Sequence, residues 1–284
     1  NLSAEVFYQY DWQNSYLPVP GTYFSTNDFA GKGGYNQNIQ LGFAGNPDID
    51  LSTLLAGLND IGSKVKAAMT TLQNPAATAA QKAAAQTALG QLPTAYLAYP
   101  TKVTLRPYGD AGEIEPEDGG QYGVKLEYFS PELNDTEFAA YFMNYHSRVP
   151  VISGIASDFR TAAISSDIAY MAANTITKDN VANLKALSKG LIQYPEDIKL
   201  YGFSFNTTLD GTSVAGEIAY RQDEPLQIDD VEILYAGMPE QLANAGLRPE
   251  LAGISQIGRY TGSKVQPGQF AQGFITSDTT QAQL

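Results

Sequence analysis

The sequence predicts a mainly β chain: part of an antiparallel transmembrane β-barrel with α-helical extracellular inserts. Three observations lead to this expectation. Apolar and polar residues alternate with a period of two in several segments. Tight turns alternate with long insertions along the chain, and outer-membrane barrels have short periplasmic turns and longer external loops. Aromatic residues gather at one end of the apolar face, as they do at a membrane interface.

The composition excludes several classes of function. Seventeen basic and 30 acidic residues give a net charge of −13, which disfavours binding of nucleic acid because phosphate neutralisation needs a basic patch. The chain has no cysteine, so disulfides, thiolate zinc sites and cysteine nucleophiles are excluded. No stretch approaches the roughly 20 apolar residues of a transmembrane helix. Barrel strands escape such a search, since their lipid-facing residues alternate with polar ones.

Residues 1–12 are predicted to form the first barrel strand. Phe7 is the one apolar residue on its polar side. The apolar side carries Leu2, Ala4, Val6, Tyr8, Tyr10 and Trp12, and the polar side carries Ser3, Glu5, Gln9 and Asp11.

Residues 13–119 are predicted to be a long external insert that contains a helical hairpin. Apolar residues recur at helical spacing from Leu51 to Leu72, and an alanine-rich helix follows Pro75. The apolar stripe is interpreted either as the buried side of this hairpin or as a docking surface or ligand groove. Residues 102–109 are expected to add a short strand before an acidic loop.

Residues 120–146 are predicted to form a barrel hairpin with a short turn at 130–135. In its second strand Ala139, Tyr141, Met143 and Tyr145 alternate with the row that contains His146. Residues 147–197 are predicted to be a second helical insert. Residues 198–221 are the second barrel hairpin, because Asp210-Gly211 is the turn chemistry favoured between antiparallel strands. Residues 222–284 are read as an irregular loop leading to a further strand near 268–276.

These strands assign candidate residues to two faces. The same division would suit a soluble sandwich, but the alternating loop lengths favour a barrel whose apolar face meets lipid and whose polar face meets a lumen. The lumen-facing candidates are Glu5, Asp11, Lys125, Glu127, His146, Glu217 and Arg221. With the tight turns in the periplasm, the expected membrane girdle is Trp12, Tyr122, Tyr145, Tyr201 and Tyr220. Cross-strand pairs among Lys125, Glu127, Glu217 and Arg221 would either only hydrate the interior or select cargo.

Three segments resemble one known family: residues 118–150 ("DGGQYGVKLEYFSPELNDTEFAAYFMNYHSRVP"), residues 194–221 and "YFSTNDFAGKGG" at 23–34. They are similar to a bacterial outer-membrane family catalogued as domain of unknown function 1302. The resemblance implies an outer-membrane barrel, often encoded beside a periplasmic lipid-carrier-like protein and an inner-membrane transporter of the resistance-nodulation-division type. It also implies a route for lipids or other hydrophobic molecules, and it supplies no catalytic residues.

The chain departs from complete members of that family. It begins on a strand and ends in "TTQAQL" instead of an aromatic-terminated strand. Five or six strands also fall short of the roughly eight that closure of a barrel requires. We therefore expect a middle segment of a longer protein, with a barrel assembled from several copies as the other explanation.

No enzyme, catalytic residue or cofactor is predicted. His146 is the only histidine, and neighbouring Ser147 points to the opposite face of a strand, so the two side chains are not expected to hydrogen-bond. The chain also lacks a Gly-x-Ser-x-Gly elbow. A weak calcium candidate is the acidic loop, which lacks EF-hand spacing and is read as solvated. Its carboxylates are Asp110, Glu113, Glu115, Glu117 and Asp118.

The expected function is that of an outer-membrane conduit or scaffold for lipids or other hydrophobic small molecules. Its expected partners are outer-membrane lipid, a periplasmic lipid-carrier-like protein and an inner-membrane transporter, with no nucleic acid. The alternative is a structural or adhesive surface protein whose barrel is only an anchor. A soluble β enzyme is a third interpretation, which His146 alone does not sustain.

Overall fold

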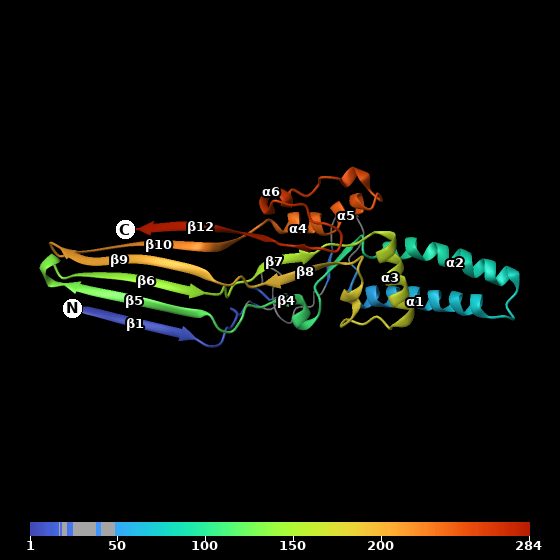
Figure 1. Cartoon of the computed structure of the whole chain (residues 1–284), viewed down its shortest axis with the longest axis horizontal. Coiled ribbons are helices and arrows are strands. Elements are labelled where there is room, and N and C mark those ends of the chain that lie inside the picture. The colour runs from blue at the N-terminus through green and yellow to red at the C-terminus, as the bar shows by residue number, and fades with distance from the viewer. Residues whose placement is uncertain (17, 19–21, 25–37, 41–48) are drawn as a thin grey trace.

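The computed structural model describes residues 1–16, 18, 22–24, 38–40 and 49–284. The molecule is elongated (Figure 1). Sheet A, of six long strands, occupies one end, three helices occupy the other, and a second sheet of six shorter strands, called sheet B, lies between them. Part of the segment 23–34, used above for the family resemblance, lies outside the described residues.

Sheet A is antiparallel throughout. Its order is β1 (Leu2–Gln9), β5 (Gln121–Ser130), β6 (Thr136–Tyr145), β9 (Ile198–Leu209), β10 (Thr212–Gln227) and β12 (Phe274–Gln283). Among the described residues β1 and β12 do not pair with each other, so both are edge strands of an open sheet. The mainly β character of the prediction is therefore confirmed at the level of two sheets with helical inserts, of which sheet A is antiparallel.

Two strands of sheet A differ from the sequence prediction. Strand β10 continues past Arg221 to Gln227, through an irregularity between Arg221 and Glu224 that interrupts the alternation on which the prediction relied. The last strand begins at Phe274 and includes most of "TTQAQL", although the prediction had centred it on 268–276. Small and polar residues make up most of β12, so its sequence carries little strand signal.

The tight turns lie at the end of sheet A that is distant from the helices (Figure 1). Asp210 and Gly211 both have positive φ, 48° and 80°, as a two-residue hairpin turn requires. Asn134 and Asp135, with φ of 54° and 53°, reverse the chain between β5 and β6 in the same way. All long connections therefore leave sheet A at its other end.

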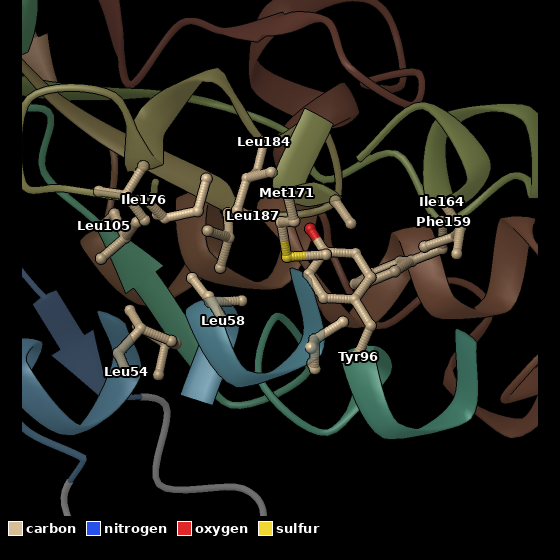
Figure 2. Packing of buried hydrophobic residues seen from close by; sticks show 14 of the residues in the cluster. Leu54, Leu58, Tyr96, Leu105, Phe159, Ile164, Met171, Ile176, Leu184 and Leu187 are labelled. Carbon is tan, nitrogen blue, oxygen red and sulfur yellow. The ribbon is translucent and has the colours of Figure 1, made fainter. Parts of the chain in front are cut away.

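The helices at the far end of the molecule enclose its largest core. Helix α1 (Leu51–Gln73) begins at Asp50, whose carboxylate accepts the N–H of Thr53, and α2 (Ala79–Leu97) begins with a capping box at Thr78 and Gln81. Helix α3 (Thr161–Ala173) packs against α1. Figure 2 shows Leu54 and Leu58 of α1, Tyr96 of α2 and Met171 of α3 turned toward one centre.

This packing decides how the apolar stripe of α1 is used. Leu54, Leu58, Ile61 and Val65 are buried, and only Met69 at its far end is 45% exposed. The stripe is therefore the buried side of the helical hairpin, as the first of the two interpretations had it.

Sheet B joins segments that the sequence prediction had kept apart. Its order is β11 (Phe270–Ala271), β7 (Val151–Ile155), β8 (Ser188–Gln193), β3 (Val103–Leu105) and β2 (Asn38–Gln40), and β4 (Glu113–Ile114) also pairs with β8. The strand near 102–109 was anticipated, and β11 lies within the strand predicted near 268–276. The others are short, and β3 and β4 run parallel to β8, so their pairing has no local signal.

Shorter helices complete the body that sheet B and the long helices form. They are α4 (Asp230–Gly237), α5 (Pro239–Asn244), α6 (Ile257–Thr261) and the 3₁₀ turns η2 (Gly109–Gly112), η4 (Val181–Asn183) and η5 (Pro249–Leu251). The 3₁₀ turn η3 (Pro131–Leu133) lies apart from them, between β5 and β6. A search of the described helices for one long and apolar enough to cross a membrane returned none.

The buried carboxylate of Asp167 links separate segments of the body through hydrogen bonds. Asp167 of α3 accepts hydrogen bonds from the Tyr96 hydroxyl and from the main-chain N–H groups of Lys185 and Ala186, each at 2.8 Å. Burial, together with the adjacent Asp167 carboxylate, raises the pKa of Tyr96 well above its usual value. The hydroxyl therefore stays a donor to Asp167 throughout the ordinary pH range.

Candidate functional site

The two faces of sheet A differ in chemistry. Cross-strand partners share a face, and one row runs Val6, Val124, Phe142, Tyr201 and Tyr220 across five strands. Ring centroids in this row are 5.0 Å apart from Phe142 to Tyr201 and 6.1 Å from Tyr201 to Tyr220, and Tyr122 of the neighbouring row lies 6.0 Å from Phe142. These contacts join the strands laterally through aromatic side chains.

The aromatic and aliphatic face, called the apolar face, is open. Phe203 is 45% exposed and Ile218 is 49% exposed, so no second layer of described residues buries them. The other large exposed side chains of this face are Leu2, Val6, Tyr8, Tyr122, Val124, Leu126, Tyr128, Tyr201 and Tyr220. A continuous apolar surface of this kind marks a face that meets a partner or a membrane.

Two of the five girdle candidates lie elsewhere. Tyr122, Tyr201 and Tyr220 share the apolar face, on the side nearer the body. Trp12 is buried instead, 4.8 Å from the Tyr194 ring by centroids, and its Nε1 donates to the Ser147 carbonyl at 3.2 Å. Tyr145 pairs with Ile198 and lies on the opposite face. The placement of Tyr145 was wrong because both alternating rows of β6 contain aromatic residues, so its sequence does not reveal which row faces out.

Charged side chains gather on the other face, called the polar face. Glu5 lies opposite Lys125, and Lys125 forms an ion pair with Glu127 of its own strand. The Ser3 hydroxyl donates to Glu127 at 3.2 Å. The ion pair of Lys125 and Glu127 therefore lies within one strand, whereas the prediction had placed such pairs across strands.

Glu217 has a tyrosine partner instead. The hydroxyl of Tyr141 on β6 reaches across β9 and donates to the Glu217 carboxylate on β10 at 2.6 Å. The Tyr141 ring lies over Gly202, where a Cβ would come within 2.1 Å of ring carbons. Phe7, the apolar residue on the polar side of β1, lies over Gly123 in the same manner. Glycine thus makes room for aromatic rings on this face.

The remaining lumen-facing candidates take no part in the contacts of Lys125, Glu127 and Glu217 described above. Arg221 shares the polar face and interacts with the Tyr145 hydroxyl. Asp11 is exposed beyond the end of β1, where it accepts from the Gln13 amide at 3.4 Å. His146 is buried at the end of β6 and does not continue the polar row, so that expectation was wrong.

His146 is held by main-chain groups on both sides of its ring. The N–H of Asp197 donates to Nδ1 at 3.1 Å, and Nε2 lies 2.7 Å from the Gly119 carbonyl. An N–H can only donate and a carbonyl can only accept, so the proton is assigned to Nε2. The Ser147 hydroxyl donates to the Val149 carbonyl at 2.7 Å, so these contacts fasten loops and assemble no catalytic pair.

The acidic loop does not gather its carboxylates around one point. Glu113 pairs with Arg106 at 2.7 Å, and Asp118 accepts the main-chain N–H of Trp12 at 3.5 Å. Within the part of the chain that the structure describes, no three His, Cys, Asp or Glu residues are grouped as a metal site would require.

A cleft that sequence reasoning missed opens on the polar face near the body. It has a volume of about 500 Å³ and is called the junction cleft. Its wall includes Phe7, Gln121, Tyr145, Arg148, Glu224 and Pro225. These residues come from four segments of the chain, so only the tertiary structure brings them together.

Comparison with known proteins gives one match. The family described as "Protein of unknown function (DUF1302)" matches residues 1–284, the whole chain, so the chain belongs to this family and the resemblance noted above is confirmed. No curated protein matches the sequence. No solved structure matches it either.

Proposed function

We propose that this member of the DUF1302 family is an outer-membrane protein in which sheet A forms part of a β-barrel wall. The barrel would serve as a conduit or scaffold for lipids or other hydrophobic small molecules. The observation that carries the proposal is the exposed apolar face of sheet A, backed by a charged face. Each square ångström of apolar surface contributes roughly 25 cal/mol when removed from water, so hydrocarbon is a favourable neighbour for this face.

The distribution of residues along the strands supports one orientation. Tyr122, Tyr201 and Tyr220 lie toward the body, and Leu126, Phe203 and Ile218 form the next rows away from it. Tyrosine favours the membrane–water interface because its ring is apolar and its hydroxyl is wet. The tight turns would then lie in the periplasm and the helical body outside the cell.

The polar face would line the lumen. Lys125 pairs with Glu127, and the Tyr141 hydroxyl donates to Glu217, so these polar groups of the wall would have partners while water hydrates them. The proposed partners are outer-membrane lipid, a periplasmic lipid-carrier-like protein and an inner-membrane transporter. Glu5 and Arg221 would add to the same wall.

The second candidate is a structural or adhesive surface protein in which the barrel only anchors the body. The extensive core that α1, α2 and α3 build independently of sheet A favours it. A lumen blocked along its length would support this candidate, whereas solute passage through the reconstituted protein would support the conduit.

The chain has no cysteine, so single-cysteine labelling tests the bilayer position of sheet A directly. In membranes, Phe203→Cys should resist a water-soluble maleimide, and the neighbouring Ser204→Cys, on the opposite face, should react through the lumen. Equal reaction of the two variants would contradict the barrel. A matched pair, Phe203→Arg and Ser204→Arg, should differ by about 2–4 kcal/mol in folding into bilayers, because an arginine facing hydrocarbon carries that cost.

The conduit itself needs a separate measurement. Purified protein in vesicles should accelerate passage of a fluorescent hydrophobic solute, and deletion of its gene should change envelope lipid traffic. If sheet A inserts but neither quantity changes, the anchor function stands and the conduit fails.

A further inference from the structure

A second cavity lies in the helical body, between the end of α2 and the segment that follows α5. Its wall takes residues from three segments of the chain, within 97–102, 238–242 and 247–254, and is called the body cavity. The cavity has a volume of about 560 Å³, within the range of roughly 300–1,000 Å³ that small-molecule sites occupy. It is therefore large enough for a small ligand, and its wall shows which kind.

The apolar part of this wall continues the helical core. Met238 and Leu242 belong to that core and are 2% and 6% exposed, and Leu97 and Leu251 pack against it. Leu247, in contrast, is 45% exposed. The body cavity thus joins exposed apolar surface to the core, and an apolar chain in it would remove such surface from water.

Hydrogen bonds hold the wall in place without a ligand. The main-chain N–H groups of Leu247 and Arg248 donate to the Leu242 carbonyl at 2.9 and 3.2 Å. The carboxylate of Glu240, which is buried and is not part of the wall, accepts the N–H of Gly253 at 3.1 Å. A site formed in advance binds more tightly, because binding does not have to order the segment 247–254.

The charged side chains of the wall are both cations, Lys102 and Arg248, and no carboxylate lines it. Arg248 Nε forms an ion pair with Glu250, whose side chain lies outside the wall. The Thr101 hydroxyl donates to the Leu97 carbonyl at 2.7 Å. Lys102 is half-buried, and its ammonium makes no hydrogen bond or ion pair with any described residue. In a chain with 30 acidic and 17 basic residues, this wall therefore holds a cation without a counter-ion.

We propose that the body cavity binds an amphiphilic anion. Its apolar chain would lie against Met238, Leu242 and Leu251, and its anionic head group beside the Lys102 ammonium. The Nη groups of Arg248, which the ion pair through Nε leaves available, would donate to the same head group. A neutral or cationic amphiphile would leave Lys102 without a counter-ion.

The carboxylate of a free fatty acid and the phosphate of a membrane lipid share this chemistry. Because the cavity lies in the body and not in sheet A, the binding does not depend on the proposed function. Only its place on a lipid route rests on that function. Binding can therefore be tested whether or not sheet A lies in a bilayer.

The absence of cysteine from the chain provides a site-specific signal. Ala98 is exposed and lines the cavity, so Ala98→Cys can carry one environment-sensitive dye there. The labelled full chain in nanodiscs is titrated with laurate, dodecyl phosphate, dodecanol and dodecyltrimethylammonium, which share one chain length. Empty nanodiscs measure how much of each probe dissolves in lipid, so that free concentrations are compared.

We expect both anions to bind at least roughly fivefold more tightly than dodecanol, as a charge-assisted contact on a half-buried lysine predicts. The cationic probe should bind more weakly than dodecanol. The tighter of the two anions identifies the head group. Butyrate, which keeps the carboxylate and lacks most of the chain, should bind at least about 100-fold more weakly than laurate.

Three lysine variants of the labelled chain test the head-group contact. Lys102→Met keeps the apolar stem and removes the charge, so the preference for anions should fall below about twofold while dodecanol binds as before. Lys102→Arg keeps the charge and should keep the preference. Lys66→Met removes the same charge from an exposed position of α1 outside the wall and should also keep it.

Three results would overturn the inference: equal binding of anions and dodecanol, an anion preference that survives Lys102→Met, or a preference lost to the same extent in Lys66→Met. Cysteine labelling at Phe203, in a separate single-cysteine variant, scores the bilayer position of sheet A. Failure of the body cavity and failure of the barrel therefore give different patterns.

Discussion

The two ends of this molecule bury their apolar residues in opposite ways. In the helical body, Leu54, Leu58 and Tyr96 are each 0% exposed and meet in one core. In sheet A, Phe203 and Ile218 keep nearly half of their surface exposed, and large apolar side chains of neighbouring strands lie beside them. The body thus provides its own apolar surroundings, whereas sheet A presents an apolar face that the described residues leave open.

The difference shows that apolar side chains are used in two ways in this chain. Helices α1, α2 and α3 stabilise themselves by packing against each other, so the body needs nothing outside the chain to satisfy its apolar residues. Sheet A is stabilised by cross-strand hydrogen bonds and lateral side-chain pairs, and its apolar face stays exposed among the described residues. Under the proposed function, lipid covers this face.

The largest expected effect is a difference in stability loss between a substitution in the helical core and one on the apolar face of sheet A. Leu58→Ala should lower the free energy of unfolding of the body by about 2–5 kcal/mol, because it leaves a cavity among fully buried side chains. Ile218→Ala should cost roughly 1 kcal/mol or less in detergent, because half of the side chain is already exposed. Hydrogen exchange of the α1 and β10 amides measures the two losses, and equal losses would mean that sheet A also has a closed core.

The second effect concerns how closely the helices approach. A Cβ on Gly62 would lie 2.2 Å from the main-chain oxygen of Met171, so Gly62→Ala should destabilise the body by about 1–3 kcal/mol. Gly90 of α2 has no atom within 4 Å of its Cβ position, and Gly90→Ala should stabilise by about 0.5–1 kcal/mol. Urea unfolding followed by the helical circular-dichroism signal compares the pair. A Gly62→Ala variant as stable as the wild type would contradict the described α1–α3 packing.

The third effect is a pH dependence confined to the body. Burial lowers the pKa of Lys189 to about 8, although its Nζ donates to the Leu184 carbonyl at 3.0 Å. The unfolded chain binds this proton up to a pH of about 10.4. The folded state thus holds fewer protons between these values, so the contribution of Lys189 to stability rises with pH from about 8 to about 10.4. At pH 7 the full cost of burying the charge remains.

Lys189→Met should therefore stabilise the body at pH 7 by about 1–2 kcal/mol, after loss of the hydrogen bond is subtracted. The gain should fade as the pH approaches 10. Thermal unfolding of variant and wild type across this range measures the difference, in which the other titrating groups cancel. A gain that is the same at pH 7 and pH 10 would exclude a protonation effect.

The smallest effect probes the polar face of sheet A. Gly202→Ala should displace the Tyr141 ring and cost about 1 kcal/mol through loss of the hydrogen bond to Glu217. In a Tyr141→Phe background, which has already lost that hydrogen bond, the hydrogen-bond part of the cost should disappear. Unfolding of sheet A in detergent provides the double-mutant cycle, and strict additivity would show that the two residues act independently.

The sequence predicted the features that depend on neighbours in the chain. Alternation located the first five strands of sheet A, Asp210-Gly211 located a turn, and the spacing from Leu51 to Leu72 located α1. The sequence prediction failed where strand pairing decides which face of the sheet a residue lies on. The aromatic residues in both rows of β6 made Tyr145 look equivalent to Tyr201, and only the register with β9 separates them.

Sequence alone therefore determined that this chain contains antiparallel strands with one aromatic face, a helical hairpin and tight turns, because period-two alternation, helical spacing and turn chemistry are local properties. Tertiary structure decided the rest: the union of the inserts in sheet B, the burial of Trp12, the anchoring of His146 and the assembly of the junction cleft. Each of these joins residues far apart in the chain, such as Thr104 and Ser188, whose hydroxyls lie 2.6 Å apart. Such pairs are selected by the packing of the whole chain and leave no periodic signal in either segment.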